Sequence, residues 1–364
     1  MANSNLVPQS FVTVLNKTLL HLQERRHPDS PLEEGRNTPQ NKNHGRNSIG
    51  KNIDNLKINT TAKNLLLASW KPSTHRQYSV HISKWENYCK EQNLDCVTPD
   101  IEHVVNFLTH LYESGLGYSA INSARSALST VVVVDGKPVE QHALVIRSLK
   151  GIFNLQPSLP KNIVTWDPAV VTKYLKTLSP VANLKLLDLS HKTAMLLLLL
   201  TGQRGQSIHL IDIRNLTVTN HYVKIRFGDA MKTTRPGFQQ KELNIKAYAP
   251  DRRLCIVTVL KEYLERTKDL RKGTQLFVGT NKPHRSVSRD TISRWIKTVM
   301  RKAGLDVSIF TPHSVRAAST SAAARSKIPL STILDTAGWS KDNTFRKYYN
   351  RPLEKDTMSE SIVK

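Results

Sequence analysis

The segment Thr311-Pro-His-Ser-Val-Arg316 carries an imidazole and a guanidinium three residues apart, behind residues that are typical of a helix start. Threonine is a common N-cap and proline is favoured at the first helical position, so we predict a helix that begins at Pro312. His313 and Arg316 would then share one face of its first turns. A helix N-terminus attracts anions, a guanidinium can grip a phosphate, and an imidazole can move a proton. The segment therefore suggests a phosphate site, although a surface helix with an incidental histidine and arginine would look the same.

Two further segments carry residues of related chemistry. Arg204 lies in Thr201-Gly-Gln-Arg-Gly-Gln206, about a hundred residues earlier. Ala337-Gly-Trp-Ser340 precedes the adjacent Tyr348 and Tyr349. An arginine at a helix end also neutralises the helix dipole, and a tryptophan also fills a core, so each residue alone has an ordinary structural explanation.

The elements that must position these residues are mainly helical. From about residue 61, apolar side chains recur at three- and four-residue steps, which predicts a compact all-α domain that ends near Phe153. In the second half, we expect Asp167 and Ser190 to cap helices, the latter ending at Gly202. Further helices are expected at Leu254–Leu264, Ser288–Ala303, Ser331–Gly338 and Thr344–Tyr349. Alternating residues in Tyr222–Phe227 and Lys241–Ala247 predict two paired strands.

Composition divides the chain into segments. Residues 1–60 are polar and are expected to be a disordered tail, because they cannot bury a core. We predict a helical domain at 61–155, a proline-marked linker at 156–166, a second domain at 167–352 and a tail at 353–364.

The charge balance indicates the kind of partner. Lys and Arg number 53 against 29 Asp and Glu, a formal net charge of +24 in 364 residues. Such an excess predicts a nucleic acid, and less often an anionic membrane surface. No apolar run approaches the roughly 18 residues of a membrane span. The three cysteines have no metal-ligand spacing, which is typical of reduced thiols in an intracellular protein.

In this order and spacing, the three segments resemble the tyrosine recombinase (phage integrase-like) family over roughly residues 61–352. The segments TGQRGQ, KTTRPG and GWSKDNTFRKYYNRP are most similar to those of recombinases from DIRS-type retrotransposons. The resemblance implies a SAM-like helical N-terminal domain and a mainly α catalytic domain with a small antiparallel β-sheet. It also implies a nuclear protein that integrates a mobile element.

The family's reaction gives each residue a role. A tyrosine attacks a DNA phosphodiester and forms a 3′-phosphotyrosyl link, and this link conserves the bond energy, so no metal, ATP or other cofactor is implied. Cationic donors stabilise the charged transition state. The implied catalytic residues are Arg204, Lys232, His313, Arg316, Trp339 and Tyr349, with Tyr348 as the alternative nucleophile.

Three assignments stay open. The family's hairpin lysine, a general acid, is expected at Lys232, with Lys241 as second choice and Lys224 as third. Many relatives carry an acidic residue three positions after the first arginine, where this chain has Ser207. Tyr348 follows Trp339 at the usual phage-type interval, but the DIRS-type context favours Tyr349, which we prefer. The other tyrosine would pack as an aromatic neighbour.

The expected function is site-specific DNA recombination on double-stranded DNA, by a homo-tetramer that holds two sites. The tail from Pro352 to Lys364 is the segment expected to reach a neighbouring protomer. Two alternatives remain: a domesticated protein that binds DNA without cutting it, and a strand-nicking enzyme like the type IB topoisomerases.

Overall fold

The computed structural model describes residues 59–157, 164–228, 234 and 239–353. The chain divides into two compact units, Met1–Leu159 and Pro160–Lys364. None of the described helices is long and apolar enough to cross a membrane.

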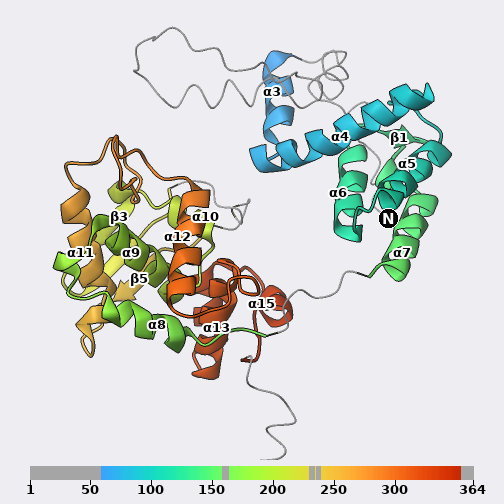
Figure 1. Ribbon diagram of the computed structural model, residues 1–364. Coiled ribbons are helices and arrows are strands. Elements are labelled where there is room, and N and C mark those ends of the chain that lie inside the picture. Colours follow the sequence, from blue (N-terminus) through green and yellow to red (C-terminus); the bar gives the residue numbers. More distant parts are fainter. Residues whose placement is uncertain (1–58, 158–163, 229–233, 235–238, 354–364) are drawn as a thin grey trace, which may run out of the picture. The chain divides into compact units, whose positions relative to one another are not determined.

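The first unit is a cluster of helices around one apolar core (Figure 1). Its elements are α3 (Thr60–Ala68), α4 (Pro72–Gln92), α5 (Ile101–Glu113), α6 (Tyr118–Leu128), the strands β1 (Val133–Val134) and β2 (Lys137–Pro138), the 3-10 helix η2 (Val139–Gln141) and α7 (Ala143–Leu155). Trp85 and Phe107 meet edge to face at 5.1 Å in the core. The indole N–H of Trp85 donates to Cys96 O, so this ring is buried without an unpaired donor.

Helix α4 begins with Lys71 as its N-cap and Pro72 at the first helical position. Phe153 does not belong to the core: its side chain is 43% exposed and meets Tyr118 edge to face. Val145, Leu149 and Ile152 already complete the buried stripe of α7.

The second unit is built around α9 (Leu186–Thr201), which is buried along most of its length. The elements that follow it are α10 (Gly205–His209), α11 (Ile256–Thr267), α12 (Arg289–Lys302) and α13 (Ser314–Arg325), and α8 (Pro168–Thr177) precedes it. Helices α11, α12 and α13 contact α9 from different sides (Figure 1). Asp167 caps α8 as predicted, and Gly202 ends α9 with φ 58°. Ser190 does not cap α9, because its hydroxyl donates to Leu186 O from inside the helix.

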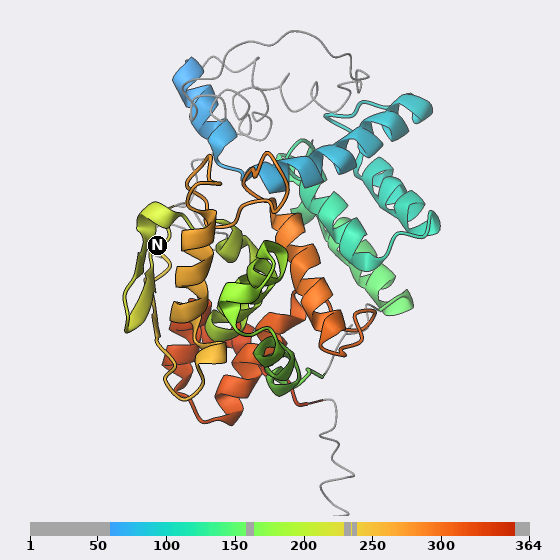
Figure 2. The same ribbon diagram turned by 60° about the vertical axis from the view of Figure 1, so that its left-hand side comes forward.

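A small antiparallel sheet lies beside α11 (Figure 2). It has the order β3 (Leu216–Val218), β4 (Tyr222–Ile225) and β5 (Leu243–Lys246), with Val223 opposite Ile245. The two predicted strands are present, and the three-residue β3 escaped prediction because it is too short to show an alternating pattern. Val223, Ile225 and Leu243 point into the core.

The last elements are α14 (Leu330–Ala337) and α15 (Asp342–Tyr348). Ser331 lies inside α14 rather than at its cap, where Pro329 stands. The buried residues Ile333, Ala337, Trp339 and Phe345 form a small apolar cluster of their own. The predicted fold class, mainly helical with a small antiparallel sheet, is thus confirmed.

The 3-10 helices of this unit are η3 (Val181–Asn183), η4 (Ile213–Asn215) and η5 (Arg252–Leu254).

Candidate active site

His313 and Arg316 lie at the start of α13, although the helix begins later than predicted. Its first residue is Ser314, and His313 is the N-cap. Thr311, Pro312 and His313 form a turn instead, in which Ser314 N donates to Thr311 O at 2.8 Å. The two side chains keep their three-residue spacing, at the N-cap and third helical position.

The guanidinium of Arg316 is buried, with 2% of the residue exposed. Its Nη1 donates to two carbonyl oxygens, Gly202 O at 2.6 Å and Ala337 O at 2.8 Å. Both acceptors lie where helices end, at the C-cap of α9 and the last residue of α14. Nε and Nη2 have no hydrogen-bond partner among the described residues. One edge of the guanidinium is thus fixed and two donor atoms remain for a ligand.

A second guanidinium reinforces the positive charge. Arg204 is the N-cap of α10, immediately after the turn that ends α9. Burial and then the charge of Arg204 lower the pKa of Arg316 to about 9, while Tyr349 opposes that shift. Arg316 therefore stays charged at neutral pH. No carboxylate of the described residues forms an ion pair with either arginine, so an anion between them would relieve their repulsion.

Ser207 is buried in α10, three residues after Arg204. Its backbone N–H donates to Arg204 O at 2.8 Å as part of the helix start. No acidic side chain therefore stands at this position beside Arg204.

Tyr349 lies against His313, with 3.0 Å between the phenolic oxygen and Nε2 of the imidazole. The same ring lies 5.2 Å from the guanidinium carbon of Arg316. Ser321 Oγ donates to Tyr349 O, which ties the backbone of this residue to α13. Tyr348 is the last residue of α15 and is 50% exposed. The structure thus brings one of the two tyrosines to His313 and Arg316.

The ring of Trp339 packs against the guanidinium of Arg316. Its ring centre lies 3.8 Å from the guanidinium carbon and 4.8 Å from the Tyr349 ring. It also packs against Phe345, so it serves as a core aromatic as well. Its Nε1 is buried without a hydrogen-bond partner among the described residues. An indole N–H can only donate, so this atom is a further donor that lacks an acceptor.

The three candidate lysines fall in different places. Lys232 lies outside the described residues. Lys241 pairs with Asp335 at 2.8 Å, and Lys224 pairs with Glu242 at 3.2 Å.

A cavity of about 460 Å³ joins the predicted residues. Arg204, His313, Arg316 and Tyr349 all line it. Gln203 and Arg289 also line it, and sequence reasoning missed both. Gln203 stands inside the quoted motif, but one amide side chain carries no spacing pattern that could have singled it out.

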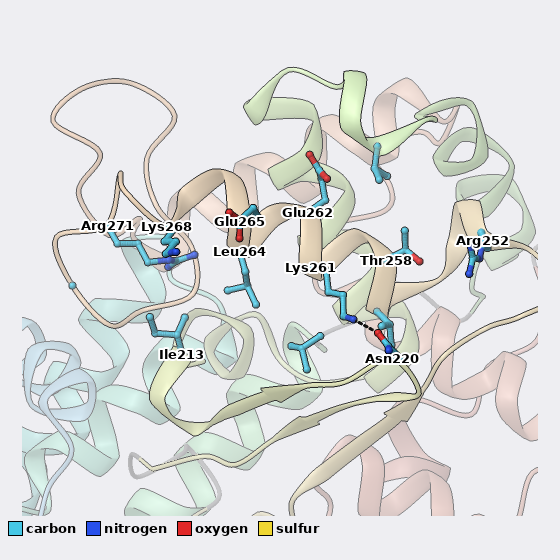
Figure 3. A pocket seen from close by; sticks show the side chains of 14 residues that line it. Ile213, Asn220, Arg252, Thr258, Lys261, Glu262, Leu264, Glu265, Lys268 and Arg271 are labelled. Carbon is cyan, nitrogen blue, oxygen red and sulfur yellow. Dashed lines mark hydrogen bonds between the residues drawn. The ribbon is translucent and has the colours of Figure 1, made fainter.

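A larger cavity of about 1040 Å³ lies along α11 (Figure 3). Its lining mixes acidic side chains, such as Glu262 and Glu265, with basic ones, such as Lys268 and Arg271. Lys261 in its wall bonds to Asn220. None of the predicted site residues lines this cavity.

The smaller cavity therefore combines three functions. Arg204 and Arg316 supply positive charge, two N–H donors of Arg316 lack acceptors among the described residues, and Tyr349 brings a hydroxyl next to an imidazole. Trp339 packs against the guanidinium but does not line the cavity. This set suits a phosphoryl group that is attacked by the phenol, since cationic donors favour the extra charge of the transition state.

Comparison with known proteins gives two family matches. The model of the phage integrase family matches residues 169–355, more than half of the chain. The model of the phage integrase N-terminal SAM-like domain matches residues 66–132. Among curated proteins, none matches the chain.

Solved structures share the fold at low sequence identity. The XerH site-specific recombinase, bound to its palindromic difH substrate after cleavage, has 17% identity and a TM-score of 0.54, with 79% of both chains covered. The Tn1549 transposon integrase, in complex with transposon right end DNA, has 15% identity and a TM-score of 0.52, with 83% of this chain and 96% of that chain covered. From the family match, which covers more than half of the chain, we conclude that the chain belongs to the phage integrase family.

Proposed function

We propose that this protein is a site-specific DNA recombinase that cuts and rejoins DNA through a 3′-phosphotyrosyl intermediate on Tyr349. The observation that carries the proposal is the 3.0 Å contact between the Tyr349 hydroxyl and His313 Nε2, beside the unpaired donors of Arg316. Family membership gives this arrangement a reaction, and the net charge of +24 gives it a polyanionic substrate.

In the first step, the phenolic oxygen attacks the scissile phosphorus and the bond to the 5′-oxygen breaks. His313 accepts the phenolic proton as the bond to phosphorus forms. Arg204 and Arg316 neutralise the non-bridging oxygens, which carry more charge in the transition state than in the ground state. Trp339 Nε1 donates to one of these oxygens. Rejoining reverses the step, with a 5′-hydroxyl of another strand as nucleophile.

The leaving 5′-oxygen needs a proton. We assign this proton to Lys232, on the connection between β4 and β5. Lys241 and Lys224 are the alternatives on flanking residues, and their ion pairs with Asp335 and Glu242 would have to open first. The choice of Lys232 rests on its place in the KTTRPG segment, which carries the family resemblance.

The choice of Tyr349 over Tyr348 rests on position. A nucleophile must lie within hydrogen-bond reach of its base. Tyr349 fulfils this condition with His313, whereas the half-exposed Tyr348 ring contacts Lys347.

Recombination of two duplexes exchanges four strands, which takes four nucleophiles. We therefore propose a homo-tetramer that holds two double-stranded DNA sites. The two structural relatives, a recombinase bound to its substrate and an integrase in complex with a transposon end, are consistent with DNA as the partner. Integration of a mobile element, a DIRS-type retrotransposon in particular, and residence in the nucleus rest on the sequence resemblance alone.

A covalent trapping experiment tests the proposal. Duplex sites are selected from a random library by binding, and one strand is nicked shortly after each possible cleavage position. After cleavage the short 5′-hydroxyl fragment diffuses away, so the protein stays attached to the DNA and migrates as an adduct. Binding without any adduct across the selected sites would favour the domesticated DNA-binding alternative. Adduct formation with relaxation of supercoiled DNA, but no strand exchange between two sites, would favour the topoisomerase-like alternative.

A further inference from the structure

The last turn of α14 has an unusual set of hydrogen-bond partners. Gly338 and Trp339 close the helix by donating their backbone N–H groups to Leu334 O, both at 2.9 Å. The next three carbonyls each accept from a side chain of a different segment. These pairs are Gln240 Nε2 to Asp335 O (3.2 Å), Gln203 Nε2 to Thr336 O (2.7 Å) and Arg316 Nη1 to Ala337 O (2.8 Å).

Gln203 occupies a special place in this set. Arg316 Nη1 binds Gly202 O and Ala337 O. Gln203 directly follows Gly202, and the carbonyl that it binds, Thr336 O, directly precedes Ala337. The amide therefore bridges the same two chain segments as the guanidinium, one residue further along each. Gln203 is 2% exposed, so water does not replace this bridge readily.

The two bridged segments adjoin different apolar clusters. Gly202 belongs to the turn that ends α9, and a Cβ there would meet Thr320 Cγ2 at 2.8 Å, so this turn is tightly enclosed. The end of α14 belongs to the small cluster of Ile333, Ala337, Trp339 and Phe345, which is separate from the large core. The polar bridges therefore fix the position of the smaller cluster relative to the larger one.

We propose that Gln203 is a positioning residue that sets the separation of Gly202 O and Ala337 O, and thereby aims Nε and Nη2 of Arg316 at the scissile phosphate. The proposal rests on the proposed function of the same site. Without the amide donor, Thr336 O loses this partner and the end of α14 shifts to find another. Ala337 O moves with it, and the guanidinium loses one of its two fixed acceptors. Trp339 is two residues after Ala337, so the indole ring that packs against the guanidinium shifts as well.

The test compares Gln203→Met with the wild-type protein, because methionine keeps the length of the side chain and removes the donor. The rate of adduct formation on nicked DNA is expected to fall about tenfold, the equivalent of one hydrogen bond. DNA binding is expected to stay within about twofold, because many other phosphate contacts remain. Gln203→Glu, which keeps the shape and lacks the donor when ionised, is the second variant if the first does not fold.

A double-mutant cycle separates positioning from general stability. In an Arg316→Lys background, Gln203→Met is expected to have little further effect on the rate, because the guanidinium that it aims is absent. Thr193→Val is the matched control. It removes another buried hydrogen bond, from Thr193 Oγ1 to Leu189 O in α9, away from α14. It should lower stability comparably without the loss of rate. Additive rate losses in the cycle would overturn the proposal.

A measurement without turnover keeps the two proposals distinguishable. Phosphate binding is measured by the rise of the thermal unfolding midpoint as inorganic phosphate is added. The component of that rise which is lost in Arg316→Lys is ascribed to this site. Gln203→Met is expected to weaken the phosphate affinity of this component several-fold. If the wild-type protein forms no adduct, the proposed function fails, and the phosphate titration still decides the role of Gln203. Phosphate binding like that of the wild type would show that the amide does not position the guanidinium.

Discussion

The hydroxyl of Tyr349 lies 3.0 Å from Nε2 of His313, although the two residues stand 36 positions apart in the chain. This distance is within hydrogen-bond range and allows a proton to pass from the phenol to the imidazole. The contact joins the N-cap of α13 to the end of α15. It therefore depends on how α14 and α15 fold back onto α13.

The two adjacent tyrosines should behave differently when their hydroxyls are removed. Tyr349→Phe should abolish the covalent adduct and leave DNA binding intact, because only the nucleophilic oxygen is lost. Tyr348→Phe should form adduct at close to the wild-type rate. Peptide mapping of the trapped adduct checks the assignment. DNA attached to Tyr348 would reverse the choice, and adduct in the double variant would exclude tyrosine chemistry at this site.

Replacement of the buried arginine should separate catalysis from binding. Arg316→Ala removes a guanidinium that lines the cavity and has two donors without a partner among the described residues. The rate of adduct formation should therefore fall on the order of 100-fold or more, as for oxyanion donors. Affinity for the same duplex should change much less. Single-turnover cleavage and equilibrium binding on one substrate measure both quantities. A parallel loss of affinity and rate would place Arg316 in general DNA binding.

DNA affinity should fall steeply with salt. Each phosphate contact of a lysine or arginine releases counterions, so the logarithm of the affinity constant decreases linearly with the logarithm of salt concentration. Titrations between about 50 and 200 mM salt should show a loss of about a thousandfold or more if six or more phosphates are contacted. An affinity that is indifferent to salt would contradict a phosphate-dominated interface.

Lys192 gives the stability of the second unit a pH dependence. It is fully buried, and its ammonium donates to Leu175 O and Leu178 O at the end of α8. Burial is the main cause that lowers the pKa of Lys192 to about 8. Between pH 8 and 10.5 the unfolded chain binds more protons at this residue than the folded chain, so the free energy of unfolding rises with pH in that window.

The contribution is on the order of 3 kcal/mol across the full window. Lys192→Met should remove this slope, whereas the exposed Lys185→Met should retain it. Denaturant unfolding at several pH values from 7 to about 10.5 measures the difference between the variants. Equal slopes in the wild type and Lys192→Met would show that Lys192 keeps an ordinary pKa in the folded protein.

The tail prediction needs a shorter truncation than the sequence suggested. Pro352 O accepts from Thr165 N at 2.8 Å, and Leu353 pairs with Thr165, so both residues belong to the second unit of their own chain. Residues 354–364 lie outside the described part. Truncation after Leu353 should preserve DNA binding and reduce the assembly of two-site complexes, measured by native electrophoresis or light scattering. Two-site assembly at the wild-type level would show that the tail does not connect protomers.

Much of the fold could be predicted from the sequence because it depends on neighbouring residues. The apolar spacing in α5 and α12, the cap at Asp167 and the glycine end of α9 each involve side chains within a few positions of one another. The order of the motifs was likewise readable, and with it the family. Predictions of helix starts failed at Pro312, Ser190 and Ser331. Pro312 lies before the first residue of its helix, whereas Ser190 and Ser331 lie inside theirs.

The arrangement of the site was decided by the tertiary structure. Arg316 takes its two acceptors from residues 114 and 21 positions away, and Gln203 reaches a carbonyl 133 positions away. The sequence determined which residue types are available, since propensity and periodicity act over one or two helical turns. Only the packing of α9, α13 and α14 selected which carbonyls hold Arg316 and which tyrosine meets His313, because those contacts depend on free energies summed over the whole unit.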